Sequence, residues 1–179
     1  MDRLERKSRA RFGFTLVELM VVVLIMSIVA VSVVPALASV SRMRQGGARD
    51  EVLRLLETAR AMAAASGRPH GVRISPMDST LTLLVARRSG DVEEAMDAVT
   101  GRVHEVSLET MYKGVSIESF ANGDGSTGQG VLWFDYEGVP HTRTGDGVFI
   151  DENSAEASLM LSSGVAVVVH PLTGMTEAP

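Results

Sequence analysis

The carboxylate of Glu18 is the side chain with the clearest chemical consequence, because it lies just before a long apolar stretch. Residues 19–38 read LMVVVLIMSIVAVSVVPALA and contain no charged side chain. Moving an ionised carboxylate into apolar surroundings costs roughly a few kcal/mol or more unless a cation pairs with it. The sequence therefore predicts a cationic partner for Glu18, and such a pair would fix the register between packed chains. A water-exposed interfacial carboxylate is the alternative interpretation.

The glycine-rich segment 123–128 spells G-x-G-x-x-G, the pattern of a dinucleotide-binding turn. Such a site requires a helix directly after the glycines. Residues 129–131 instead lead into a predicted strand, so we interpret the segment as a loop whose glycines adopt positive φ. Asn122, Asp124 and Ser126 could ligate calcium, but the twelve-residue loop with its terminal glutamate is absent. Calcium binding by loop 122–128 is left open, and no cofactor is predicted.

The remaining polar residues do not form a catalytic pattern. The chain has no cysteine. Its four histidines share no metal-ligand spacing: His70, His104, His141 and His170. Asp135 and Glu137 are explained by a turn before Gly138, and residues 162–164 (SSG) by a turn between two strands. We therefore predict no catalytic residue, no metal site and no enzyme.

The apolar stretch has the length of a membrane span. A helix of twenty residues is about 30 Å long, roughly the hydrocarbon thickness of a bilayer. Pro35 lies near its far end and predicts a kink, because proline lacks an N–H and clashes with the preceding turn. Residues 1–13 carry a net charge of +3 and the rest of the chain −8. This asymmetry favours a cytoplasmic N-terminus and disfavours nucleic acid as a partner.

Two other interpretations of the N-terminus compete with this one. A secretory signal also has a basic start, and residues 36–38 (ALA) form a small-x-small cleavage site. However, the apolar run over residues 19–34 is slightly longer than the usual ~7–15 residues. A plain single-pass anchor is the third interpretation. Neither a secretory signal nor a plain single-pass anchor gives Glu18 a role.

Beyond the apolar stretch, the pattern stays helical but becomes amphipathic. Apolar residues recur at three- and four-residue spacing at Val52, Leu55, Leu56, Ala59, Met62 and Ala63. Asp50 and Arg54 have the four-residue spacing of an ion pair. Gly46 and Gly47 predict a point where the helix loosens. Residues 66–69 (SGRP) predict its end.

The C-terminal part predicts short strands. They are centred on residues 72–74, 81–85, 115–118, 131–134, 148–150, 159–161 and 165–169, the last as a central strand covered on both faces. Residues 91–99 are interpreted as a variable excursion that could hold a short helix. Close spacing predicts antiparallel sheets that pack on the apolar helix face. The predicted fold is α+β, with a long N-terminal helix, transmembrane in one half and amphipathic in the other, packed on a C-terminal antiparallel β domain.

Residues 11–19 (RFGFTLVEL) resemble the class III signal of type IV pilins and type II secretion pseudopilins. The resemblance implies that a prepilin peptidase cleaves after Gly13 and that Phe14 becomes the N-methylated mature N-terminus. Glu18 would then be fifth in the mature chain and Pro35 twenty-second, as in that family. It also implies that the Phe14 amine of a neighbouring copy is the cationic partner of Glu18.

Four later segments carry a second resemblance: 133–138 (WFDYEG), 157–161 (ASLML), 167–169 (VVV) and 173–174 (TG). They are similar to H-type minor pseudopilins and to their pilus relatives of the FimT and FimU kind. The sequence departs from that pattern at Met175, where an arginine is usual, and over residues 139–156, which are irregular.

These resemblances imply a leader at 1–13, a transmembrane and filament-core helix at 14–38, an amphipathic continuation at 39–66 and a periplasmic β-rich domain at 67–179. The expected function is that of a minor pseudopilin in the inner membrane and pseudopilus. Its expected partners are the prepilin peptidase, other major and minor pseudopilins, the inner-membrane secretion platform and the lipid bilayer. A type IV minor pilin that contacts DNA is the alternative.

A basic patch would carry the DNA alternative, and the sequence offers two places for it. One is Arg87-Arg88, and the other is formed by His141 and Arg143.

Overall fold

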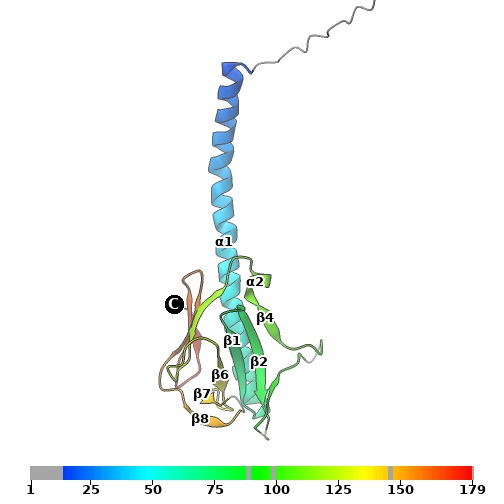
Figure 1. The fold of residues 1–179 in the computed structure, drawn as a ribbon, viewed down its shortest axis with the longest axis vertical. Helices are drawn as coiled ribbons and strands as arrows, with labels where there is room; N and C mark the ends of the chain where they lie inside the picture. Colours follow the sequence, from blue (N-terminus) through cyan, green and yellow to red (C-terminus); the bar gives the residue numbers. More distant parts are fainter. Residues whose placement is uncertain (1–13, 88–89, 98–99, 145–146, 179) are drawn as a thin grey trace, which may run out of the picture. The chain divides into compact units, whose positions relative to one another are not determined.

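A computed structural model describes residues 14–178 except 88–89, 98–99 and 145–146, and the side chains of residues 32–37 are also outside the description. The chain divides into two compact units, 1–41 and 42–179. Helix α1 (Leu16–Ser66) runs through both (Figure 1). The other elements are β1 (His70–Ser75), β2 (Thr80–Ala86), β3 (Val92–Glu94), β4 (Glu105–Ser107), α2 (Leu108–Met111), β5 (Ile117–Ala121), β6 (Gly130–Phe134), β7 (Pro140–Arg143), β8 (Phe149–Glu152), β9 (Ala157–Leu161), β10 (Ala166–Val169) and β11 (Thr176–Glu177).

The second half of α1 is the central element of unit 42–179. Five of its six predicted apolar positions are fully buried, and Met62 is partly buried: the five are Val52, Leu55, Leu56, Ala59 and Ala63. The helix ends as predicted, because Gly67 adopts a φ of +64° and donates its N–H to the Ala63 carbonyl at 3.0 Å. The apolar face and the stop at residues 66–69 are therefore confirmed.

The two glycines of α1 do not loosen it. The helix is continuous through Gly46 and Gly47. A Cβ on Gly47 would lie 2.7 Å from a ring carbon of Tyr112, whereas a Cβ on Gly46 would meet nothing within 4 Å. The predicted loosening is therefore wrong. Gly47 leaves space for the Tyr112 ring to pack against the helix backbone.

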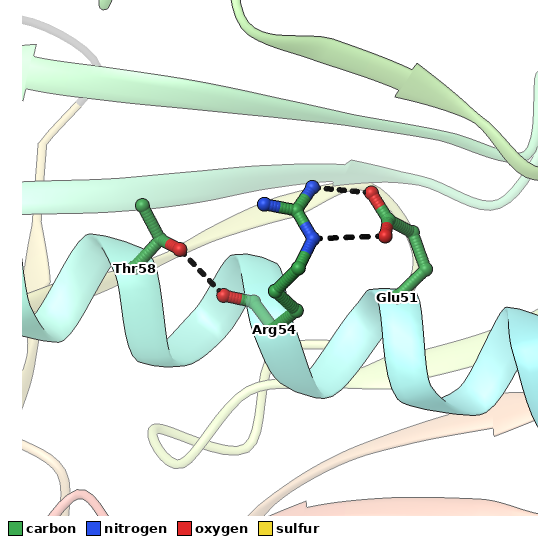
Figure 2. Close-up of polar contacts among 3 residues, drawn as sticks. All are labelled: Glu51, Arg54 and Thr58. Carbon is green, nitrogen blue, oxygen red and sulfur yellow. Dashed lines mark hydrogen bonds and ion pairs between the residues drawn. The ribbon is translucent and has the colours of Figure 1, made fainter.

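The exposed side of α1 carries an ion pair different from the expected one. The Arg54 guanidinium donates to both carboxylate oxygens of Glu51, at 2.5 and 2.9 Å, and the Thr58 hydroxyl donates to the Arg54 carbonyl at 2.6 Å (Figure 2). Asp50 instead accepts from Arg49. The hydrogen bond from Arg54 holds the pKa of Glu51 below its usual value, although burial opposes this.

Two antiparallel sheets make up the β part of unit 42–179. Within the described residues, the first sheet has the strand order β3-β2-β1-β6-β7-β8, with β4 also paired to β2, and the second has the order β11-β10-β9-β5. Both contribute to one core with α1, including Val72 and Phe134 from the first sheet and Leu159 from the second. The predicted α+β fold with antiparallel sheets packed on the helix is therefore confirmed.

The other local predictions have mixed outcomes. Residues 92–94, in the segment interpreted as a variable excursion, form the edge strand β3 and not a short helix. The strand predicted at residues 148–150 is present as β8, whereas β7 was not predicted. Strand β10 is buried on one face only, because Val167 and Val169 are buried while the two alternate residues are half-buried. Short or half-polar strands give little periodic signal, and pairing with neighbouring strands stabilises them instead.

Ser79 connects the first sheet with the second. It lies in the β1–β2 turn and adopts a φ of +50°, which is unusual for a residue with a side chain. Its hydroxyl accepts a hydrogen bond from the Ile117 N–H at 3.1 Å, and its carbonyl accepts one from the Leu108 N–H at 3.0 Å. The turn therefore holds the beginning of β5.

The outer face of the first sheet carries a small separate apolar cluster. Leu84, Ala86 and Trp133 are buried there, while Leu83 on the opposite face belongs to the main core. The indole of Trp133 lies over Gly71, where a Cβ would come within 2.7 Å of the ring. Gly71 therefore allows the indole to lie close to the backbone of β1.

Candidate functional site

The start of α1 brings Thr15 and Glu18 together. The Thr15 hydroxyl accepts a hydrogen bond from the Glu18 N–H at 3.2 Å, and the Thr15 carbonyl accepts one from the Leu19 N–H at 3.1 Å. Thr15 is thus the N-cap, and Glu18 is the third helical residue. The carboxylate in the first turn also interacts favourably with the helix dipole. The T-x-x-E spacing is a capping-box signal that the sequence reasoning missed.

The first turns of α1 expose an unbroken apolar surface. From Phe14 to Val31, the large apolar side chains are 43–76% exposed. They are Phe14, Leu16, Val17, Leu19, Met20, Val21, Val22, Val23, Leu24, Ile25, Met26, Ile28, Val29 and Val31. A helix that is apolar on all sides normally packs against other helices or lipid. This surface is therefore the candidate functional site.

By hydropathy, the described part of the chain contains no helix long and apolar enough to cross a membrane. The predicted transmembrane segment 14–38 includes residues 32–37, whose side chains are outside the description. The segment therefore remains a prediction, and so does the kink at Pro35.

The predicted processing site lies at the edge of the described residues. Leader residues 1–13, including Gly13, are outside the description, while Phe14 is exposed just before α1 begins. Cleavage after Gly13, methylation of Phe14 and pairing of Glu18 with a neighbouring copy therefore remain predictions. Phe14 lies just before the helix whose first turn contains Glu18.

Loop 122–128 uses its polar groups internally. One Asp124 carboxylate oxygen accepts from the Ser126 amide at 2.8 Å and from its hydroxyl at 2.6 Å, and the other accepts from the Thr142 hydroxyl at 3.2 Å. Burial would raise the pKa of Asp124, but these hydrogen bonds outweigh it and lower the pKa. Gly125 and Gly128 have positive φ, as expected of a loop. Within the described residues, no cluster of three or more histidine or carboxylate side chains could hold a metal.

The other motifs are turns, as predicted. The Asp135 carboxylate accepts hydrogen bonds from the amides of Glu137 and Val139 at 2.9 and 2.8 Å, and Gly138 has a φ of +81°. Residues 162–164 connect β9 and β10 through a hydrogen bond from the Gly164 N–H to Leu161.

His141 and His170 each interact with neighbouring side chains. His141 is fully buried, accepts a hydrogen bond from the Arg143 Nε at 2.7 Å and lies 5.5 Å from the Phe149 ring. Burial, assisted by the nearby Arg143 charge, lowers the pKa of His141 to about 4. His170 lies between Glu156 and Glu177, at 3.1 and 3.2 Å.

Comparison with known proteins finds a sequence motif in the N-terminal part of the chain and a similar fold among solved structures. The Prokaryotic N-terminal methylation motif matches residues 8–34. No curated protein shows a significant sequence match. Two structures of the minor pseudopilin EpsH from the type II secretion system of Vibrio cholerae share the fold, with 14% identity to this chain. Their TM-scores are 0.54 and 0.52, and the matches cover 75% and 73% of this chain and 94% and 92% of EpsH.

The type IV minor pilin FimU of Pseudomonas aeruginosa is similar at 11% identity over 75% of this chain and 91% of FimU, but its TM-score of 0.45 is too low to support an argument. The exposed apolar surface of residues 14–31 lies within the methylation motif, and the fold is similar to that of EpsH. The chain therefore combines a Prokaryotic N-terminal methylation motif over residues 8–34 with an α+β fold similar to that of EpsH.

Proposed function

We propose that the chain is a minor pseudopilin, a structural subunit of a type II secretion pseudopilus that supports protein export. The observation that carries this proposal is the exposed apolar surface of residues 14–31, which lies within the methylation motif. Full burial of a large apolar side chain gains about 1.5–3 kcal/mol. A surface of this length therefore strongly favours insertion into lipid or packing against other helices.

In this proposal, a prepilin peptidase removes residues 1–13 on the cytoplasmic side, and Phe14 is then methylated. Residues 14–38 reside in the inner membrane and later in the filament core, while 39–66 and 67–179 lie in the periplasm. The partners are other major and minor pseudopilins and the inner-membrane secretion platform. The role of the chain is mechanical, with no catalysis of its own.

Glu18 would pair with the methylated amine of Phe14 on a neighbouring copy. The first turn of α1 supports this proposal, because it holds Glu18 in a defined place one turn from the end of the mature chain. A buried charge pair at that position would penalise every axial offset that separates the two groups.

Mass spectrometry of the native protein, purified from a host that has the peptidase, tests the processing. We expect a mature chain that begins at N-methylated Phe14. A chain that begins at Ser39 would indicate secretory cleavage, and an intact chain that begins at Met1 would indicate a plain anchor. Either of these results would refute the proposal.

A type IV minor pilin that contacts DNA is the second candidate, and one observation favours it. A hollow of about 380 Å³ in unit 42–179 is lined by Arg68, Arg87 and Arg143. Arg87 is paired with Glu93 at 2.5 Å, so its charge is already compensated. Retention of the protein on DNA at low salt, lost at high salt and in Arg68→Gln, would support this candidate. Equal retention of Arg68→Gln would exclude this hollow as the contact.

A further inference from the structure

A second hollow lies on the outer face of the first sheet, within unit 42–179. Its volume is about 310 Å³, and it is lined by β1, β2, β3, β6, β7 and loop 122–126. Its lining includes the side chains of Arg73, Asp124, Val131 and Arg143. It contains no residue of α1, so an inference about it does not depend on the proposed function.

The register of the sheet places two arginines of this hollow opposite the same residue of β6, one on each neighbouring strand. Arg73 of β1 pairs with Val131 of β6. Trp133 of β6 pairs with His141 of β7, and the same antiparallel register places Arg143 opposite Val131. Adjacent strands are about 4.8 Å apart, so the two arginine backbones are separated by about 10 Å. Their side chains start from the same face, on either side of Val131.

Arg143 carries a charge that no carboxylate compensates within the described residues. Its Nε donates to His141 at 2.7 Å, and one Nη donates to the Gly147 carbonyl. Its guanidinium also lies 5.9 Å from the ring centre of Trp133. These neighbours are neutral, and a guanidinium has five N–H donors, so the remaining donors and the charge are available to a ligand.

Arg73 is the more exposed of the two arginines. Its ion pair with Glu94 is long, at 3.4 Å, and both side chains are more than one-third exposed. Such a pair contributes little to stability, so exchange of Glu94 for another carboxylate has a low cost. The two arginines can therefore hold a carboxylate between them, because a guanidinium binds a carboxylate in bidentate geometry.

The other walls of the hollow indicate the class of ligand. Val92 and Val131 are half-buried apolar side chains on its lining, and its volume exceeds that of a single small anion. The ionised Asp124 lies on the same lining and repels any anion placed near it, so it disfavours the closely spaced phosphates of a nucleic acid strand more than one carboxylate held between the two arginines. An extended peptide with both apolar and acidic side chains matches these walls. We propose that this hollow is a docking site for an acidic segment of another protein, with one carboxylate between Arg73 and Arg143.

Trp133 is the only tryptophan of the chain and reports directly on Arg143. The full chain in detergent micelles would be titrated with a capped hexapeptide of alternating glutamate and valine. We expect a saturable change in tryptophan fluorescence that weakens with salt. Arg73→Gln and Arg143→Lys should each weaken binding about tenfold or more, the second because lysine lacks the planar fork. Arg49→Gln, an exposed arginine on α1, is the matched control and should bind like wild type.

Three results would overturn the proposal. They are absence of a saturable change in the wild-type chain, unchanged affinity in Arg73→Gln, and competition by millimolar inorganic phosphate or by a single-stranded oligonucleotide as strong as competition by the peptide. Arg143→Lys also alters the contacts with His141 and Gly147 and can affect folding. Arg73→Gln removes none of those contacts, so it tests the site even if Arg143→Lys does not fold.

Discussion

The Thr15 hydroxyl accepts a hydrogen bond from the backbone N–H of Glu18 at 3.2 Å, which makes Glu18 the third residue of a capped helix. Glu18 therefore has a local role at the helix start in addition to the proposed pairing between subunits. The local role depends on the backbone N–H and on the interaction of the carboxylate with the helix dipole. The pairing depends on the negative charge alone.

Two substitutions distinguish the proposed pairing from the hydrogen bond between Thr15 and the Glu18 N–H. Glu18→Gln keeps the backbone N–H that Thr15 caps but removes the charge, so we expect normal leader removal and a severe loss of filament assembly. Thr15→Ala removes the cap, which costs about 1 kcal/mol of local helix stability, and should leave assembly largely intact. Immunoblots of sheared filaments, together with mass spectrometry of the N-terminus, measure both outcomes. Normal assembly of Glu18→Gln would exclude the pairing.

Adjacent glycines in α1 should respond oppositely to the same substitution. Gly46→Ala adds a methyl group where nothing lies within 4 Å, so it should stabilise the helix by about 0.5–1 kcal/mol. Gly47→Ala places its methyl group against the Tyr112 ring and should destabilise the protein by about 1–3 kcal/mol. Urea unfolding of the two variants in detergent compares them directly. Equal stabilisation by both would show that Tyr112 moves aside without cost.

His141 should make stability depend on pH between about 6.5 and 4. The unfolded chain protonates this histidine near pH 6.5, whereas the folded protein resists protonation until about pH 4. The unfolded state therefore binds the proton first, and stability falls as the pH decreases through this window. Between pH 7.5 and pH 5, the loss due to His141 is about 2 kcal/mol.

His141→Gln should remove that share of the pH dependence. Phe149→Leu alters the ring contact but keeps the imidazole, so it is the control and should retain the dependence. His70, whose pKa burial also lowers, adds a smaller dependence of the same sign in all variants. Urea titrations at the two pH values measure the difference. An unchanged difference in His141→Gln would contradict the assignment.

A double-mutant cycle should find coupling between Glu51 and Arg54 but not between Asp50 and Arg54. The first pair makes two hydrogen bonds, at 2.5 and 2.9 Å, and should contribute about 0.5–1 kcal/mol (Figure 2). Asp50 is paired with Arg49 instead. Unfolding free energies of the single and double glutamine variants give both coupling energies. Comparable values would mean that Arg54 exchanges between the two acids in solution.

The helix and its buried face could be predicted because their signal is local and repeated. Leu55, Leu56 and Ala59 recur with the period of a helix, and Gly67 marks its end. Strand β7 could not be predicted in the same way, whereas the strand predicted at residues 148–150 is present as β8. Strand β7 is four residues long and reads PHTR, so no alternation of apolar and polar residues marks it.

The candidate sites also differ in whether their residues are adjacent in the sequence or far apart in it. The methylation motif and Glu18 are contiguous in sequence, and a short pattern is enough to find them. The pairing of Arg54 with Glu51 depends on rotamers that spacing alone does not determine. The hollow between Arg73 and Arg143 arises from residues that are seventy positions apart, and only the pairing register of three strands brings them together.

The turn at Ser79 has a consequence for how the protein opens to solvent. Its hydroxyl and carbonyl hold the amides of Ile117 in β5 and Leu108 in α2, so an opening of the turn at the end of the first β hairpin releases both. Local fluctuations that expose one amide should expose the other. In deuterium-exchange measurements, these two amides should therefore be protected to a similar degree and behave as one cooperative unit.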